Sequence, residues 1–258
     1  MFTPNEYGLF SMPTLETPRL ILRRMTMKDA KDVFEYSRDA DVARHVLWSA
    51  QKDIGERISN VVLMGMGEPL DNYKNVLRFL ELVSSENGLN IGLRHISLST
   101  SGVVSGIKKL KEYNLPITLS ISLHAPSDDI RSSVMPVNKR WNIDELLAAC
   151  KEYQAVTTRR ISFEYALIDG VNNSDACADM LAKKLRGIMC HVNLIPANPV
   201  KENSFKKPDR NKILRFKERL AANGVNATVR RTLGADIDAS CGQLRKRVKE
   251  GESIADIQ

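Results

Sequence analysis

Polar side chains follow several short apolar runs along this chain, at the points where each run ends. They are the carboxyl group of Glu68, the hydroxyls of Ser99 and Ser122, the imidazole of His124 and the amide of Asn198. Together these groups could accept hydrogen bonds from an amine, donate to a carboxylate and pair with ribose hydroxyls. That combination suits a zwitterionic nucleoside. Taken alone, each residue favours a structural role, such as an ordinary strand-to-helix turn or, for His124, a hydrogen-bonded loop histidine.

The first of these turns is Gly67-Glu68-Pro69, which ends the apolar run that begins at Val61. Glycine lets a ligand come close to the backbone because it has no Cβ. Proline ends a strand because it has no N–H for the ladder. The turn therefore predicts a carboxylate held at the end of a buried strand.

Alternating strand and helix patterns would bring these turns to one edge of a sheet. We expect strands at 61–66, 95–100, 117–123, 160–168, 191–195 and 225–231, and helices near 73–85, 103–113, 143–154, 174–187 and 208–222. Such alternation predicts a parallel α/β sheet or barrel. The carboxyl ends of parallel strands share one edge, where α/β proteins bind their ligands.

Residues 1–51 form a separate segment in this interpretation. Leu15–Arg24 has the pattern of a strand, Thr26 is placed to cap a helix over residues 27–38, and residues 39–48 suggest a second short helix. Residues 12–50 resemble the opening of the GNAT acetyltransferase fold, although that family's acetyl-CoA loop does not follow. We therefore expect a GNAT-like fragment over 1–51, a polar joint over 51–59 and the main domain over 52–258.

The charge balance favours a polyanionic partner. The chain has 38 lysines and arginines against 31 aspartates and glutamates, a formal net charge of +7, and much of the excess lies between Lys201 and Lys249. Clustered basic residues suit RNA, although a solvated basic face would have the same composition. No apolar run approaches the roughly 20 residues that cross a bilayer, and the chain opens on no signal-peptide pattern. We therefore expect a cytoplasmic protein with no membrane partner.

The four cysteines predict no metal site. Cys150, Cys177, Cys190 and Cys241 lie too far apart in the sequence for a zinc or iron–sulfur motif. Without a secretory signal, a disulfide framework is not expected either. Three of the thiols fall in predicted core elements, whereas Cys241 lies in a polar context before Gly242.

Five motifs occur in order along the chain: Gly65-Met66-Gly67-Glu68-Pro69-Leu70, Leu98-Ser99-Thr100-Ser101-Gly102, Ile121-Ser122-Leu123-His124-Ala125-Pro126, Asn193-Leu194-Ile195-Pro196-Ala197-Asn198-Pro199 and Asp236-Ile237-Asp238-Ala239-Ser240-Cys241-Gly242-Gln243-Leu244. Together they resemble the radical S-adenosylmethionine (SAM) methyltransferases that modify carbon 2 of an adenine in 23S ribosomal RNA, the RlmN/Cfr-like family. The resemblance covers residues 52–250. Many members of that family also act on tRNA.

The resemblance implies a contact with SAM for most of the polar residues. Gly67 and Glu68 would hold the methionine amine. Ser99 and the segment Ser122-Leu123-His124 would contact the ribose and carboxylate side, and Asn198 would contact the adenosine end.

The resemblance also implies that Cys241 is the catalytic methyl carrier. In the family, this cysteine takes a methyl group from one SAM molecule, and a radical from a second SAM activates that methyl for addition to adenine. A thiolate is well suited to accept the first methyl group. The target base must leave its stack to be reached, and the basic C-terminal third would hold the RNA phosphates.

The chain departs from the family pattern upstream of Gly67. The family's Cys-x-x-x-Cys-x-x-Cys loop, which ligates a [4Fe–4S] cluster, has no counterpart here, nor do its first barrel strand, its second cysteine and its RNA-binding accessory domain. SAM cannot be cleaved reductively without the cluster, so we expect this chain alone to be inactive. The expected fold is α/β: an incomplete TIM-like radical-SAM barrel of parallel strands with outer helices, preceded by a short αβ fragment.

The implied partners are 23S rRNA and tRNA, with no DNA, and members of the family are usually monomeric. Two other hypotheses remain open. A non-catalytic SAM- and RNA-binding remnant would bind RNA in a salt-dependent way without turnover. A GNAT-type N-acetyltransferase would bind acetyl-CoA, and the missing acetyl-CoA loop argues against it.

Overall fold

The computed structural model describes residues 15–17, 20–22, 47, 49–53, 55–64, 67–197 and 205–230. Within these residues, one parallel sheet of six strands has the order β3-β4-β5-β6-β7-β8. The strands are β3 (Val61–Leu63), β4 (Ile96–Thr100), β5 (Thr118–Ser122), β6 (Ile161–Leu167), β7 (Cys190–Pro196) and β8 (Ala227–Val229). The sheet is not closed, because β3 and β8 each pair on one side only among the described residues. The predicted partial barrel of parallel strands is confirmed.

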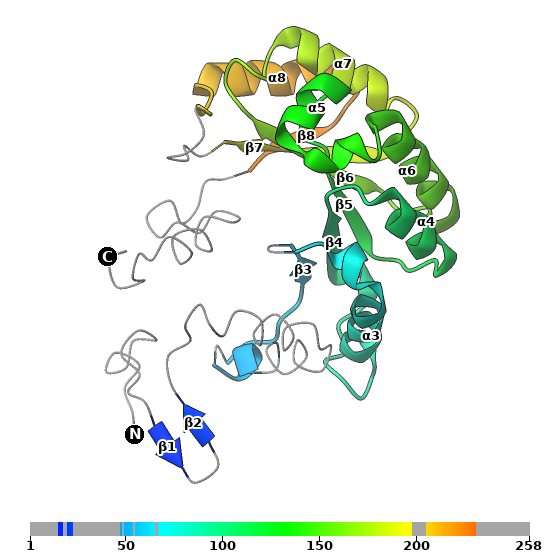
Figure 1. The fold of residues 1–258 in the computed structure, drawn as a ribbon, viewed down its shortest axis with the longest axis vertical. Helices are drawn as coiled ribbons and strands as arrows, with labels where there is room; N and C mark the ends of the chain where they lie inside the picture. The colour runs from blue at the N-terminus through cyan, green and yellow to red at the C-terminus, as the bar shows by residue number, and fades with distance from the viewer. Residues whose placement is uncertain are drawn as a thin grey trace.

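Helices connect the successive strands and lie on the outer side of the curved sheet (Figure 1). They are α3 (Tyr73–Ser84), α4 (Val104–Glu112), α5 (Asp128–Val134), α6 (Ile143–Thr157), α7 (Asp175–Leu185) and α8 (Arg210–Ala222). Three short 3-10 helices accompany them: η2 (Pro69–Asn72), η3 (Leu93–His95) and η4 (Pro136–Lys139). None of these described helices is long and apolar enough to cross a membrane.

The two faces of the sheet differ in chemistry because side chains alternate along each strand. On β6, for example, Phe163 and Tyr165 are fully buried in the core with the helices, and the Tyr165 ring lies 5.4 Å from that of Phe216 on α8. The opposite, inner face carries polar residues that face one another in register across the strands. One such row is Ser99-Ser120-Ser162-His191, and the next is Ser122-Glu164-Asn193-Thr228. The inner face of the open barrel is therefore built to meet a polar ligand.

The N-terminal segment differs from its prediction. The single strand predicted over Leu15–Arg24 was wrong, because β1 (Leu15–Thr17) and β2 (Leu20–Leu22) form an antiparallel pair. Pro18 lies between them, and proline has no N–H to donate and favours turns. The helix predicted over residues 27–38 lies outside the described residues. Residues 49–53 are helical, so the start of the predicted polar joint belongs to a helix.

Helix α5 was not predicted, and it breaks the strict alternation of one helix per strand. It follows β5 and precedes η4 and α6, so this crossover contains two α-helices. Ser127 precedes it, and Asp128 and Asp129 lie in its first turn. These residue types favour a helix N-terminus. They are the local signal that could have located α5.

Candidate functional site

Glu68 joins the carboxyl ends of β3 and β4. Its Oε2 accepts hydrogen bonds from the Ser101 N–H at 2.7 Å and the Ser101 hydroxyl at 2.8 Å. Its Oε1 accepts from the Leu70 N–H at 3.1 Å and so caps η2. A carboxylate offers about four acceptor positions, and these three bonds leave one for a further donor. The sequence placed this carboxylate at a strand end, and the structure also gives it fixed partners.

Ser99, Ser122 and Leu123 lie at the ends of the two neighbouring strands. Ser99 is 9% exposed and faces inward from β4. Ser122 ends β5 on the same inner face, opposite Glu164 of β6. Leu123 is only 1% exposed, and its N–H donates to the Glu164 carbonyl at 3.0 Å. Its carbonyl accepts from Arg131 Nε at 3.1 Å, so both backbone groups of Leu123 are bonded within the chain, and its contact with a ligand stays a prediction.

His124 links the end of β5 to β6 through hydrogen bonds. Its Nδ1 accepts from the Ala166 N–H at 3.0 Å, its N–H donates to the Glu164 carbonyl at 3.2 Å, and its carbonyl accepts from Asn172 Nδ2 at 2.8 Å. Because Nδ1 is an acceptor, the neutral ring carries its proton on Nε2. Desolvation and the nearby Arg131 cation lower the pKa of His124 to about 4. The imidazole is therefore neutral at pH 7, and Nε2–H is the group left for a ligand.

This histidine is expected to make the fold sensitive to acid. Its folded pKa of about 4 lies below its ordinary value of 6.5, so its stabilising contribution is complete above pH 6.5 and lost as the pH falls through about 4. Urea unfolding at about pH 7 and about pH 4.5 should show a loss of about 2 to 3 kcal/mol from this group. His124→Asn, which tolerates the observed φ of +59°, should show a smaller loss. Equal losses in the two proteins would contradict this assignment.

Glu164 is a polar residue of the inner face that the sequence analysis overlooked. Its side chain accepts from Asn193 Nδ2 at 2.7 Å and from the Ser162 hydroxyl at 3.2 Å. The residue is 5% exposed, and desolvation raises the pKa of its carboxyl group against the effect of those hydrogen bonds. A single charged residue inside an otherwise uncharged strand was the signal that could have identified it.

Of the three remaining predicted site residues, the structure describes one. Gly67 has a φ of +95°, and a Cβ there would meet no described residue within 4 Å, so within the described part of the chain the backbone beside Glu68 is open to a ligand. Asn198 and Cys241 lie outside the described residues. The roles of these two residues stay predictions.

The described cysteines do not fit a [4Fe–4S] cluster, which requires neighbouring thiolates. Cys150 on α6 and Cys177 on α7 are buried, and Cys190 on β7 is half-buried. Burial raises the pKa of Cys150 to about 12 and that of Cys190 to about 11, so both thiols stay protonated at neutral pH. Across the described part of the chain, no group of three or more His, Cys, Asp or Glu residues is placed to hold a metal ion.

Aspartates already bind several of the basic side chains of α8. The salt bridges are Lys212 with Asp169, Arg215 with Asp175 and Arg219 with Asp179. They tie α8 to α7 and to the loop that precedes α7, although ion pairs exposed to water contribute little to stability. The prediction that the basic C-terminal third holds RNA phosphates stays a prediction. These three side chains are its weakest candidates.

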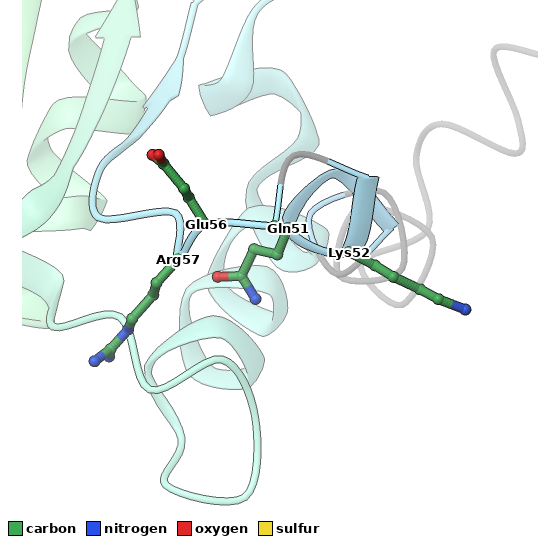
Figure 2. Close-up of a pocket in the computed structure, with 5 residues that line it drawn as sticks. Gln51, Lys52, Glu56 and Arg57 are labelled. Carbon is green, nitrogen blue, oxygen red and sulfur yellow. The ribbon is translucent and has the colours of Figure 1, made fainter. Parts of the chain in front are cut away.

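A shallow hollow near the start of the main domain does not form a second site. Figure 2 shows that Glu56 and Arg57 point away from each other and that Lys52 points away from both. Two of the lining side chains already make hydrogen bonds within the chain. Arg57 donates to the Asn90 carbonyl at 2.8 Å, and Gln51 accepts from the Ile58 N–H at 2.9 Å.

Comparison with known proteins gives a family match over much of the chain. The family model described as "Radical SAM superfamily" matches residues 32–181. A protein of Desulforamulus reducens named "Probable dual-specificity RNA methyltransferase RlmN" is 53% identical over 197 residues, which cover 76% of this chain and 56% of that protein. A protein of Clostridium botulinum with the same name is 55% identical over 200 residues, covering 78% of this chain and 58% of its own length. The chain thus spans less than two thirds of these relatives.

Solved structures agree with this match. The crystal structure of a radical SAM methyltransferase from Sphaerobacter thermophilus is similar with a TM-score of 0.74 and 47% identity, covering 79% of this chain and 60% of that one. Streptococcus suis SuiB bound to S-adenosylmethionine has a TM-score of 0.51 at 14% identity and covers 86% of this chain and 47% of its own. At that identity, the second likeness concerns the fold alone.

Proposed function

The chain belongs to the radical SAM superfamily, and from this premise we propose that it is the SAM- and RNA-binding part of an RNA methyltransferase. The reaction we propose is methylation of carbon 2 of adenine in 23S rRNA and in tRNA, with the methyl group carried on Cys241. We further propose that the enzyme acts as a monomer. The GNAT-like start over residues 1–51 and the domain boundary that follows it stay predictions.

The main support for the proposal is that hydrogen bonds connect the ends of three neighbouring strands, at Glu68, Ser101 and Ser122. Glu68 at the end of β3 bonds to Ser101 at the end of β4, and the carbonyls of Ser101 and Ser122 share one donor, Arg131. These segments are among the motifs that resemble the adenine-C2 methyltransferases. Neighbouring carboxyl ends of parallel strands are where α/β proteins bind ligands.

The polar groups here suit the methionine and ribose parts of SAM. The free acceptor position of Glu68 would take an N–H of the ammonium group, beside the open backbone of Gly67. The hydroxyls of Ser99 and Ser122 and the Nε2–H of His124 would face the ribose and carboxylate. When bound, SAM would supply the methyl group and, once reduced by a [4Fe–4S] cluster that the described residues do not hold, the radical, whereas these residues would bind and orient it.

A chimera tests the function. The N-terminal part of the Desulforamulus reducens relative, up to the residue that aligns with Lys52, would be fused to residues 52–258 and expressed in a bacterial strain lacking its own enzyme. We expect 2-methyladenosine in 23S rRNA and tRNA, measured by mass spectrometry of RNA nucleosides. We expect none from the same chimera carrying Cys241→Ala, because the methyl carrier is then missing.

Two further samples complete this experiment. The 258-residue chain alone should give no product and, after treatment with iron and sulfide, no visible charge-transfer absorption, because its described cysteines do not fit a cluster and its sequence has no Cys-x-x-x-Cys-x-x-Cys loop. The proposed function is wrong if the chimera makes no 2-methyladenosine while the intact relative makes it in the same strain. Salt-dependent RNA binding by that inactive chimera would instead favour the non-catalytic remnant.

A further inference from the structure

Arg131 is a buried cation that no strand-end motif includes. It lies in the middle of α5 and is 0% exposed. Burying a guanidinium is costly unless its donors are satisfied. No carboxylate lies within salt-bridge distance among the described residues, so the positive charge is compensated mainly by backbone carbonyl dipoles.

Three of its hydrogen bonds end on the strand-end segments. Nη2 donates to the Ser101 carbonyl at 2.7 Å and to the Ser122 carbonyl at 3.2 Å, and Nε donates to the Leu123 carbonyl at 3.1 Å. The guanidinium is planar and rigid. It therefore bridges the end of β4 and the end of β5, just beyond the last paired residues, Thr100 and Ile121.

The guanidinium is also hydrogen-bonded to η4. Nη1 donates to Asn138 Oδ1 at 3.0 Å. Asn138 in η4 in turn donates to the Asp128 carbonyl at 3.2 Å and to the Ser132 hydroxyl at 2.8 Å. Arg131 is therefore bonded both to η4 and to the two strand ends.

A continuous chain of contacts links this residue to Glu68. Arg131 holds the carbonyl of Ser101, while the N–H and hydroxyl of the same serine hold the Glu68 carboxylate. A displacement of the guanidinium would therefore move Ser101 and with it the carboxylate. The same displacement would move the backbone of Ser122 and Leu123 on the neighbouring strand.

We propose that Arg131 is a positioning residue for SAM: it sets the separation of the β4 and β5 ends so that Glu68, Ser122 and His124 meet the ligand together. This inference rests on the proposed function, because it needs SAM at these strand ends. Arg131 is 0% exposed, and four of its five N–H groups donate to protein oxygens, so it would act on a ligand indirectly. Its effect on binding is transmitted through Ser101 and the carbonyls of β5.

Arg131→Lys tests the proposal in the full 258-residue chain. Lysine keeps the charge but replaces the rigid fork by a single flexible ammonium, so it cannot hold three carbonyls at fixed positions. We expect a folded protein whose SAM affinity, measured by isothermal titration calorimetry, is about tenfold lower, as the loss of one or two charge-assisted hydrogen bonds implies. Arg186→Met, which removes an exposed arginine at the end of α7, should leave the affinity unchanged.

A second variant keeps the test decisive if Arg131→Lys does not fold. Asn138→Ala leaves the cation in place but frees it from η4, and it should lower the affinity for SAM several-fold. A nuclear magnetic resonance titration of His124 adds a further readout. Its pKa should change in both variants, because the position of the Arg131 cation contributes to it.

The outcomes separate this inference from the proposed function. If the unaltered chain binds SAM and the folded variants bind it equally well, the positioning role is overturned while the SAM site stands. If the unaltered chain does not bind SAM, the site fails and the positioning role fails with it. Weaker SAM binding in folded variants, with the Arg186→Met protein unaffected, supports the inference.

Discussion

Replacing Gly102 with alanine is expected to lower the free energy of unfolding by about 3 kcal/mol. Gly102 has a φ of +104°, and a Cβ there would lie 3.0 Å from Arg131 Nη2 and 3.0 Å from Leu146 Cδ2. Both neighbours are fully buried, so neither can move aside cheaply. Backbone strain and overpacking cost about 1 to 3 kcal/mol each. Urea unfolding, followed through the midpoint concentration, measures the loss.

Gly187→Ala is the matched control for this substitution. Gly187 also has a positive φ, +80°, but a Cβ there would meet nothing within 4 Å among the residues that the structure describes. Its replacement should therefore cost only the backbone term, about 1 kcal/mol. If the two alanine variants lose the same stability, the close approach of Gly102 to Arg131 is not a determinant of the fold.

Replacing Glu68 with alanine is expected to weaken SAM binding by more than about tenfold and to lower stability by about 2 to 3 kcal/mol. The substitution removes the acceptor proposed for the ligand's ammonium group. It also leaves the N–H groups of Leu70 and Ser101 without their acceptor. Buried donors without partners cost about 1 to 3 kcal/mol each. Isothermal titration calorimetry and urea unfolding give the two quantities separately.

Two further variants show which property of Glu68 matters. Glu68→Gln keeps one acceptor oxygen but loses the charge, so it should recover part of the stability while binding SAM weakly. Glu86→Ala, at an exposed position after α3, should change neither quantity. Full SAM affinity in Glu68→Ala would exclude this carboxylate from the site.

The main elements of the fold could be predicted because local sequence patterns indicate where they begin and end. Apolar runs bounded by glycine or proline gave β4 and β6 within a residue or two of their observed bounds. The start of α6 is marked by Asn142 and by Glu145 three residues later, and these two residues form a capping box, bonded to each other in both directions. Strand ends were therefore predictable. Residues at those ends could be named before any contact was known.

The contacts made across the sheet could not be predicted in the same way. Glu164 faces Ser122 and Asn193 only because of the register between β5, β6 and β7, and one strand does not specify the register of its neighbour. Arg131 was overlooked for a different reason. Its helix has seven residues, which are too few to show a clear apolar period. The partners of Arg131 are mainly backbone carbonyls, and the sequence does not show which carbonyls a side chain will contact.

Hydrogen–deuterium exchange of the full chain with and without SAM would locate the ligand on the sheet. If the carboxyl ends of β3, β4 and β5 form the SAM site, SAM should slow exchange in peptides covering residues 67–70, 99–102 and 122–125. Exchange in α7 and α8 should not change. Protection that is absent from all three segments, or that appears only in α7 and α8, would contradict the account.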